Sequence, residues 1–352
     1  MLGTIIVPFA EKVFGDHNYE VLTSSRNGIQ RQSEHFAGKQ RHDTDGYNII
    51  PRGYCTYRNR SDDGLFTFNM NNIVDEGIVS KFYPVFTFQN ANSTFMMEYL
   101  NSSPRVRAKL SVLAVGTSQV VLSFETLKET SFYLPSFEEQ NRIAALLSTL
   151  NKRIEKQRLL VEHLKKYKRG LLTAVFNQKI HVTNDDEEWQ ECRIGDILKI
   201  LHGRDYKDYQ APNGEYPVLG TGGVIDHATK YLCDWACVLI GRKGTIDKPQ
   251  YMDKPFWTVD TLFYSKPESS HNPRFQYYLF QTINWKKYNE ASGVPSQSSS
   301  TIEGINVCVP NPHTQETIAN LFSRVDELID DHAVILARLQ ECKKGLMQQL
   351  FI

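Results

Sequence analysis

Residues 135–176 read PSFEEQNRIAALLSTLNKRIEKQRLLVEHLKKYKRGLLTAVF, and residues 310–351 read PNPHTQETIANLFSRVDELIDDHAVILARLQECKKGLMQQLF. The two stretches align without a gap, 175 residues apart, and twelve positions are identical, among them Gln140/Gln315. Because one unit recurs twice, each time after a long and different segment, the chain is a tandem duplication and not a solenoid. We therefore expect its function to be doubled as well.

Each copy carries apolar residues that recur in alternating steps of four and three. They are Ile143, Leu147, Leu150, Ile154, Val161, Leu164 and Leu171 in the first copy, and Ile318, Phe322, Val325, Ile329, Leu336, Leu339 and Leu346 in the second. Polar residues complete each stripe, namely Gln157 and Lys168 in the first copy and His332 and Lys343 in the second. A period of 3.5 residues over several heptads is typical of a helix that pairs with another helix. About forty helical residues would extend roughly 60 Å, which suits a spacer.

Charge indicates which partner each helix takes. From Glu138 to Arg169 the first copy carries nine Lys or Arg against four Glu, a net +5. From His313 to Lys344 the second carries four Lys or Arg against six Asp or Glu, a net −2. Opposite flanking charges favour pairing of unlike helices over self-pairing. We predict that the two helices pack on each other, antiparallel, within one chain; the alternative, in which each covers a separate core, fits the strict seam less well.

Length and composition limit the classes of protein to which the chain can belong. A chain of 352 residues has room for two or three domains, and 41% hydrophobic with 23% charged residues is ordinary for a globular protein. No apolar stretch reaches the roughly 18 residues of a membrane span, and the N-terminal MLGTIIVPFAEKVFG lacks the features of a secretory signal. We expect a cytoplasmic protein. Because the net charge is zero, any contact with nucleic acid must be local.

The sequence contains no recognisable catalytic or metal-binding motif. The six cysteines are scattered, and we expect reduced thiols. Cys233 and Cys237 are four residues apart, but no second pair lies at zinc-ligand spacing. GxGxxG, GxxxxGKS/T, HExxH and GxSxG strings are also missing. The sequence therefore predicts no metal site and gives no sign of catalytic residues, but an enzyme stays open at this point, because catalytic groups can converge from distant positions in a chain.

The segments before the two helices are rich in short β-type runs separated by turn residues, which predicts compact domains dominated by twisted sheet. Each segment also contains a helical stretch, near 94–101 in the first and near 274–282 in the second. The chain thus predicts an α+β fold with pseudo-two-fold internal symmetry. Its parts are a first domain at 1–134, a helical spacer at 135–176, a linker at 177–187, a second domain at 188–309 and a second helical spacer at 310–352.

Loops of both domains place Arg, Lys, Ser, Thr and Gln beside glycines. Such side chains suit phosphate contacts and base-edge hydrogen bonds, although a single Arg of this kind is more often a solvated surface charge. The candidate DNA contacts are Ser24, Arg26, Arg31, Arg58 and Arg60 in the first domain, and Arg204, Lys207, Arg242, Lys243, Thr245 and Gln297 in the second.

These features resemble the specificity subunits of Type I restriction-modification enzymes. The resemblance rests on LPSFEEQNRIAALLSTLNKRIE, on its return as VPNPHTQETIANLFSRVDELID, and on runs such as YEVLTSSR at 19–26 and VLIGRKGTI at 238–246. The family implies two target recognition domains, each of which reads one half of a bipartite, asymmetric DNA site. It also implies that the paired helices fix the number of unread base pairs between the halves.

The same resemblance implies partners and their cofactors. The helices would dock two methylation subunits, which carry S-adenosylmethionine and methylate adenine, and restriction subunits that use ATP and Mg would join through them. This chain would perform no chemistry itself. One departure concerns the first domain, which residues 3–14 open almost directly, whereas WQECRIGDILKI at 189–200 opens the second domain. We expect the first domain to lack this Trp-containing turn.

Three alternatives stay open. The chain could be an interaction scaffold whose variable domains bind protein or glycan, a subunit of a related system with a fused nuclease and methylase, or a silent, recombining cassette. Salt dependence separates the scaffold from a DNA reader, because replacement of counterions makes DNA affinity fall steeply with salt.

Overall fold

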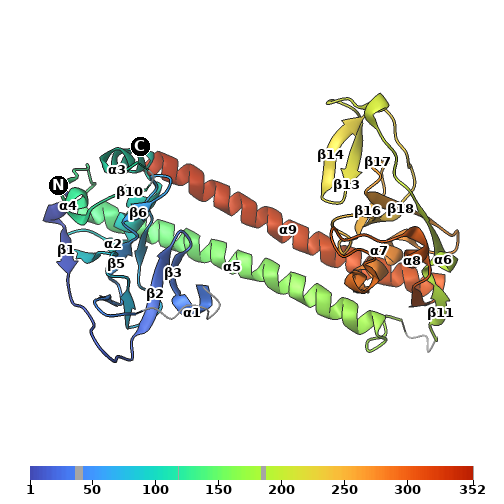
Figure 1. The fold of residues 1–352 in the computed structure, drawn as a ribbon, viewed down its shortest axis with the longest axis horizontal. Helices are drawn as coiled ribbons and strands as arrows, with labels where there is room; N and C mark the ends of the chain where they lie inside the picture. The colour runs from blue at the N-terminus through green and yellow to red at the C-terminus, as the bar shows by residue number, and fades with distance from the viewer. Residues whose placement is uncertain (36–42, 118, 184–187, 352) are drawn as a thin grey trace. The chain divides into compact units, whose positions relative to one another are not determined.

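The computed structural model describes residues 1–35, 43–117, 119–183 and 188–351. Its contacts divide the chain into two compact units (Figure 1). Unit 1 comprises Met1–Arg158 and the C-terminal stretch from Ile335, and unit 2 comprises Leu159–Val334. Each unit holds one β-rich domain and a part of both long helices, so the predicted α+β fold is confirmed. The division passes through both predicted spacers, and the predicted domain limits remain a prediction; within the linker, 184–187 lie outside the described residues.

The described residues of unit 1 form two four-stranded sheets and one two-stranded pair. The first sheet is antiparallel with the order β1-β9-β5-β7, the second has the order β3-β2-β8-β4 with β2 and β8 parallel, and β10 pairs with β6. The strands are β1 (Ile6–Phe9), β2 (Glu20–Ser25), β3 (Gly28–Arg31), β4 (Asn48–Pro51), β5 (Cys55–Tyr57), β6 (Arg60–Ser61), β7 (Phe68–Met70), β8 (Glu76–Val79), β9 (Val85–Phe88) and β10 (Val120–Val121).

The described residues of unit 2 form an antiparallel sheet β12-β18-β15-β16, a sheet β14-β13-β17 with β13 and β17 parallel, and a β11–β19 pair. The strands are β11 (Gln190–Arg193), β12 (Leu198–Leu201), β13 (Tyr216–Gly220), β14 (Gly223–Ala228), β15 (Cys237–Gly241), β16 (Gln250–Met252), β17 (Trp257–Thr258), β18 (Leu262–Pro267) and β19 (Asn306–Val309).

The two domains share one plan. The order β1-β9-β5-β7 corresponds to β12-β18-β15-β16, and β3-β2-β8 corresponds to β14-β13-β17, with a parallel pair at the same place. In each domain a helix follows the second strand of the first sheet: α2 (Ser93–Ser102) follows β9, and α7 (Pro273–Thr282) follows β18. The two predicted domain helices are therefore confirmed. The β11–β19 pair has no counterpart among the described residues of unit 1.

The two long helices are α5 (Phe137–Phe176), with 40 residues, and α9 (Pro312–Leu350), with 39. Ser136 Oγ accepts the Glu139 N–H at 3.3 Å, and Asn311 Oδ1 accepts the Thr314 N–H at 2.8 Å, so a side chain caps the start of each helix. All fourteen predicted seam residues are buried or half-buried. The stripe of period 3.5 is therefore present.

The shorter helices are α1 (Gln32–His35), α3 (Pro104–Leu113), α4 (Phe124–Glu129), α6 (Ile194–Ile197), α8 (Ser299–Glu303), η1 (Leu2–Thr4), η2 (Lys207–Tyr209) and η3 (Trp285–Tyr288).

In unit 1 the beginning of α5 meets the end of α9. Ala144 and Leu147 are buried in one cluster with Phe351, and Leu346 packs against that cluster. The seam lysine Lys343 reaches Glu98 of α2, with Nζ 3.3 Å from Oε1. The two copies of the helix are thus in contact within this unit.

In unit 2 the end of α5 meets the beginning of α9. Val175 is buried together with Ile318 and Phe322. The equivalent seam lysine, Lys168, lies 2.6 Å from Asp326 and is only 12% exposed. A polar group in a helix seam specifies register at some cost in stability, so Lys168, which pairs with a residue of α9, helps to align α5 with α9. Pairing along the whole length of the helices remains a prediction.

The cysteines are free thiols. Burial raises the pKa of the Cys55 thiol to about 12, which keeps it protonated and unreactive. The Sγ atoms of Cys233 and Cys237 lie 4.0 Å apart, and both residues are buried.

Across the described ranges, no group of three or more His, Cys, Asp or Glu is placed to hold a metal ion. In the same ranges, no helix combines the length and the apolar character that crossing a membrane requires.

Candidate nucleic-acid interface

A groove of about 260 Å³ in unit 1 gathers hydroxyl and guanidinium groups. The residues that line it are Thr23, Ser24, Ser25, Arg26, His35, Arg58, Arg60, Ser61, Asp62, Leu65, Thr67 and Tyr83. The structure therefore brings together four of the five contacts predicted for the first domain, namely Ser24, Arg26, Arg58 and Arg60. They come from β2 and the turn after it, from the chain between β5 and β6, and from β6 itself.

The β2–β3 turn holds Arg26 at the groove. Ser25 lies opposite Gly28 in the antiparallel pair, and Gly28 has a φ of +107°, which L side chains rarely adopt. Ser25 Oγ donates to the Gly28 carbonyl at 3.0 Å and accepts the Asn27 N–H at 3.1 Å. The turn is thus fixed by its own hydrogen bonds, which reduces the ordering cost of binding a ligand there.

The arginines of the groove differ in whether a neighbouring carboxylate compensates their positive charge. Arg26 Nη2 donates to Asp63 Oδ2 at 2.5 Å. Hydrogen bonds from Ser61 and from Arg26 lower the pKa of Asp63 to about 2, so it stays ionised at neutral pH. Arg58 and Arg60 are exposed, and within the described part of the chain neither forms an ion pair. Two guanidinium charges are therefore available to an anionic ligand.

An exposed aromatic ring lies beside these charges. The Arg60 guanidinium is 5.3 Å from the ring centroid of Phe82, and Lys81 Nζ is 5.7 Å from it. Phe82 is 51% exposed. Cations near a ring face are attracted to it, which orients their side chains. Lys81 and Phe82 are not among the contacts predicted from the sequence, although an aromatic residue next to a lysine was the available signal.

Arg31, the fifth predicted contact of the first domain, does not line the groove. It pairs with Glu20, and its Nη1 lies 3.7 Å from Glu34 Oε1. The hydrogen bond that Arg31 Nε donates to the Glu20 carboxylate raises the pKa of Arg31. Because two carboxylates compensate its charge, we leave Arg31 out of the surface proposed below.

In unit 2 five of the six predicted contacts lie on two loops, and these loops attach to the end of β17 and to the chain between β17 and β18. The Arg204 N–H donates to the Thr258 carbonyl, and the Arg242 N–H donates to the Thr261 carbonyl, both at 2.8 Å. The Arg242 guanidinium pairs with Asp260. The end of β17 and the chain between β17 and β18 thus hold the loops after β12 and β15 in place.

Glycine precedes both of these arginines for a steric reason. A Cβ at Gly203 would lie 2.1 Å from the Val259 carbonyl oxygen, and one at Gly241 would lie 2.1 Å from the Thr245 carbonyl oxygen. No larger residue fits at such a distance. Glycine therefore stands before each of these arginines because two backbone segments approach closely there. The arginine that follows extends outward from the close contact.

The other predicted contacts of the second domain extend these two loops. Lys207 is exposed and follows Arg204 on one loop, whereas Lys243 is exposed and Thr245 half-buried on the other. Gln297 is only 3% exposed, and its Nε2 donates to the Gly241 carbonyl at 2.8 Å. In this structure Gln297 supports the loop, and we leave it out of the surface proposed below.

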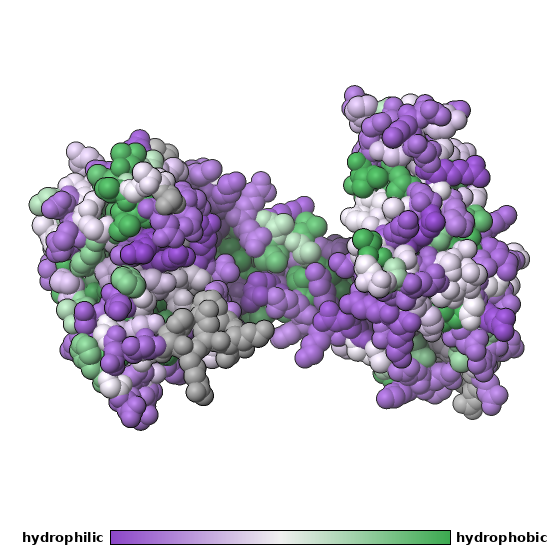
Figure 2. Space-filling model, in the orientation of Figure 1, coloured by the Kyte–Doolittle hydropathy of each residue, from purple (hydrophilic) through white to green (hydrophobic). Residues whose placement is uncertain are grey.

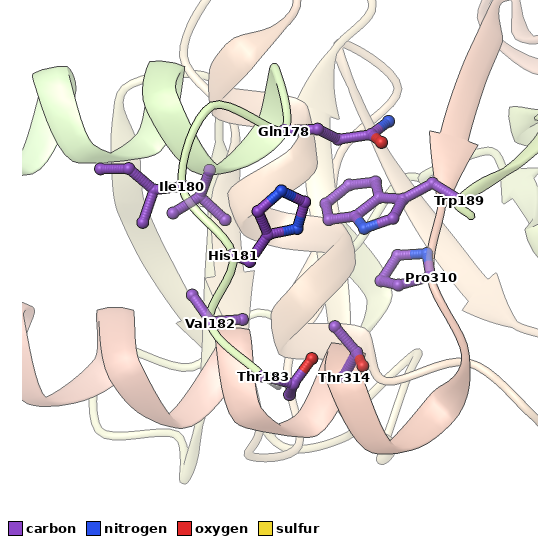
Figure 3. A pocket seen from close by; sticks show the side chains of 9 residues that line it. Gln178, Ile180, His181, Val182, Thr183, Trp189, Pro310 and Thr314 are labelled. Atoms are coloured by element: carbon purple, nitrogen blue, oxygen red, sulfur yellow. The ribbon is translucent and has the colours of Figure 1, made fainter. Parts of the chain in front are cut away.

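A cavity in unit 2 beside the start of α9 is too small for a ligand (Figure 3). Its volume is about 10 Å³, which holds about one water molecule. The ring of His181 lies beside the indole of Trp189, with Pro310 and Thr314 close to them (Figure 3). This region is a packed joint between the segment after α5 and the first turn of α9.

The surface of each unit suits a polar ligand. On the face drawn in Figure 2, hydrophilic residues cover most of each unit, with small hydrophobic patches between them. Interfaces with DNA are more polar and more positively charged than interfaces between proteins. The uncompensated arginines of unit 1 lie on such a surface.

Comparison with known proteins gives consistent matches. A curated relative is the Type I restriction enzyme MjaVIII specificity subunit of Methanocaldococcus jannaschii, 24% identical over an alignment of 190 residues that covers 49% of this chain and 44% of the relative. The match thus spans less than half the length of that curated protein.

Solved structures show the same fold. The S subunit of a Type I restriction-modification system from M. genitalium has a TM-score of 0.68 at 16% identity and covers 100% of this chain and 95% of its own. A chain described under complex assembly and conformational transition of the type I R-M system has a TM-score of 0.57 at 15% identity, with 99% and 96% covered.

The match to a family model falls on both halves. The model for the Type I restriction modification DNA specificity domain matches residues 15–162 and again residues 186–341. These ranges follow the duplication in the sequence and cover most of the chain. The chain therefore belongs to the family of Type I restriction modification DNA specificity domains, and it contains that domain twice.

Proposed function

We propose that the chain is the DNA-specificity subunit of a Type I restriction-modification complex. Each domain reads one half of a bipartite, asymmetric DNA site, and the paired long helices set the number of unread base pairs between the halves. The observation that carries this proposal is the specificity domain itself, present twice and joined to a duplicated helix. Two different domains on two equivalent helices suit two different half-sites.

The groove of unit 1 supports a DNA ligand for the first domain. Arg58 and Arg60 supply charge without a carboxylate partner, and a guanidinium suits both phosphate and the O6/N7 edge of guanine. Ser24 adds a hydroxyl on the groove wall. In the second domain we assign DNA contacts to Arg204, Lys207, Arg242 and Lys243, with Thr245 beside them; of these, Arg242 is paired with Asp260.

The outer faces of the helices support docking of partner subunits. Leu159 and Leu160 of the first copy are each 38% exposed, and their equivalents Val334 and Ile335 are 49% and 43% exposed. Apolar side chains that stay exposed at equivalent positions of both copies suit two copies of one partner. We assign these faces to two methylation subunits, through which restriction subunits join.

The chain itself is proposed to be non-catalytic and to bind no cofactor. S-adenosylmethionine, ATP and Mg belong to the partner subunits in this proposal. The assembly would methylate adenine and cleave DNA with ATP, in the cytoplasm. Our assignment of the chemistry to partners is supported by the family and by the lack of catalytic motifs in the sequence.

Substitution of Arg58 and Arg60 by Ala tests the groove. Each phosphate contact that is lost should lower the slope of log affinity against log salt by about 0.9. A contact to a base should cost about 1–3 kcal/mol and relax specificity at one position. The measurement is a salt titration of binding to a fluorescently labelled duplex of mixed sequence.

The matched control for these substitutions is Arg52→Ala. Arg52 belongs to the same domain and carries the same charge, but it lies outside the groove lining, where its Nε donates to Asp75 Oδ1 at 2.8 Å. We expect the control to keep the wild-type slope. Equal slopes for the wild type, the control and the double variant would contradict a role of the groove in DNA binding.

A further inference from the structure

The same buried glutamine occurs at the start of both long helices. Gln140 of α5 and Gln315 of α9 occupy identical positions of the repeat, and they are 3% and 0% exposed. Burial of a primary amide is costly unless its oxygen and nitrogen find partners. The contacts of these two side chains therefore indicate what each contributes.

Both glutamines make the same pair of hydrogen bonds. Gln140 Nε2 donates to the Pro135 carbonyl at 2.9 Å, and Gln140 Oε1 accepts the Asn92 N–H at 3.0 Å. Gln315 Nε2 donates to the carbonyl of its own preceding proline at 2.9 Å, and Gln315 Oε1 accepts the Asn272 N–H at 3.0 Å. Each amide thus bridges the start of a long helix and a residue of the domain.

The residue that each glutamine holds is the N-cap of the domain helix. Asn92 Oδ1 accepts the Phe95 N–H at 3.0 Å at the start of α2. Asn272 Oδ1 accepts the Arg274 and Phe275 N–H groups at 2.9 and 3.1 Å at the start of α7. The side chain of the asparagine starts the helix, and its backbone N–H is held by the glutamine. The first turns of two helices are therefore tied together in each unit.

Aromatic packing surrounds the hydrogen bonds of each glutamine, but it does not fix the angle between the two helices. Phe351 lies 5.8 Å from Phe95, and the equivalent Phe176 lies 5.4 Å from Phe275, measured between ring centroids. Hydrophobic contact is non-directional and scales with buried area. Hydrogen bonds depend steeply on distance and angle. The packing thus supplies stability, whereas directional hydrogen bonds set the angle between domain and helix. Asn92 Nδ2 donates to Asn141 at 2.7 Å in unit 1 and Tyr278 Oη donates to Asp326 at 2.9 Å in unit 2, and the buried glutamine is the directional contact that both units share.

We propose that Gln140 and Gln315 are positioning residues that fix the angle between each recognition domain and the helix that follows it. The functional consequence of this inference rests on the proposed function. A fixed angle makes the complex selective for one gap length between the half-sites. The residues touch no DNA in this account and act through Asn92 and Asn272.

Replacement of both glutamines by Met tests the consequence. Met keeps most of the volume and loses these four hydrogen bonds, together with a fifth that joins Gln315 Nε2 and His271 Nδ1 at 3.0 Å. In complex with the methylation subunit, the wild type should methylate targets with one gap length. The double variant should keep both half-site sequences, while its preference over targets with a gap one base pair longer or shorter falls about tenfold, the effect expected for the loss of one to two net hydrogen bonds.

Controls separate positioning from general destabilisation. Tyr57→Phe removes a buried hydrogen bond to the Leu122 carbonyl, 3.0 Å long, in the first domain. Gln276→Met removes the bond from a fully buried glutamine to the Ile197 carbonyl, 2.9 Å long, in the second. Neither bond reaches a long helix, so both controls should keep the wild-type gap selectivity. Relaxed selectivity in the controls, or unchanged selectivity in the Met variant, would overturn the inference.

A second measurement needs no DNA. Spin labels at Val112 of α3 and Lys156 of α5, both in unit 1, report the angle between domain and helix when the exposed Cys308 and Cys342 are replaced by Ser. We expect Gln140→Met to broaden the distance distribution and Tyr57→Phe to leave it unchanged. If Met prevents folding, Gln140→Glu replaces it, because Glu keeps the acceptor for Asn92 and loses the donor to Pro135. An unchanged distribution would overturn the inference.

The two measurements distinguish failure of the inference from failure of the proposed function. If the wild-type complex shows no bipartite site, the proposed function is wrong, and the spin-label distances still decide whether the glutamine fixes the angle. If the wild type selects one gap and the Met variants select it equally well, the inference alone is wrong.

Discussion

Exchange of residues 188–309 for the corresponding domain of another specificity subunit is expected to change one half of the recognised DNA sequence completely and to leave the other half as it was. The reason is that each domain has its own core and its own loops. The second domain is built on the β12-β18-β15-β16 sheet, and its candidate loops are anchored within unit 2. Sequencing of methylated adenines before and after the exchange measures both halves at once.

The reciprocal exchange of residues 1–134 is the control for this experiment, and it should change the opposite half. The seam between the long helices and the contacts between each domain and its helix stay in place in both chimaeras. The number of unread base pairs between the half-sites should therefore be the same as in the wild type. A chimaera in which both halves change would show that the domains do not read DNA independently.

Insertion of seven residues into each long helix is expected to lengthen the unread gap without altering either half-site. Insertions after Arg158 and after Val334, at the boundary of the two units, add one heptad to both seams and preserve the stripe. Seven residues extend a helix by roughly 10.5 Å, about three base-pair steps of 3.4 Å. Three steps also rotate DNA by about a third of a turn, so we expect slower methylation at the new gap.

The matched control carries the same heptad in α5 alone. This insertion leaves the two helices unequal in length and should abolish methylation at every gap. Targets with gaps of increasing length, methylated in one mixture and read by sequencing, give the preference directly. Retention of the wild-type gap by the doubly extended protein would contradict the role of the helices as a spacer.

The long helices could be predicted from the sequence because their pattern is local and occurs twice. A heptad stripe depends on residues one or two turns apart, and duplication provides an independent copy of it. The sequence marked Lys168 and Lys343 as polar residues in the seam but did not reveal their partners. Lys343 reaches Glu98, which is 245 residues away in the chain, and such a pair depends on tertiary packing.

The candidate site could be predicted only in part. Composition selected Arg58 and Arg60, which do line a groove with exposed charge. It could not show that Glu20 would neutralise Arg31, because that pair depends on the register of β2 against β3. Nor could it show that Gln297 would be buried, since the Gly241 carbonyl that it contacts is brought to it by the sheet.

The most direct test of the account is to express the chain together with its methylation subunit and to map every methylated adenine in the host DNA. We expect one asymmetric sequence in two parts, separated by a gap of constant length whose bases are unspecified. Methylation of a single continuous sequence, of a sequence with variable gaps, or of no defined sequence would contradict it.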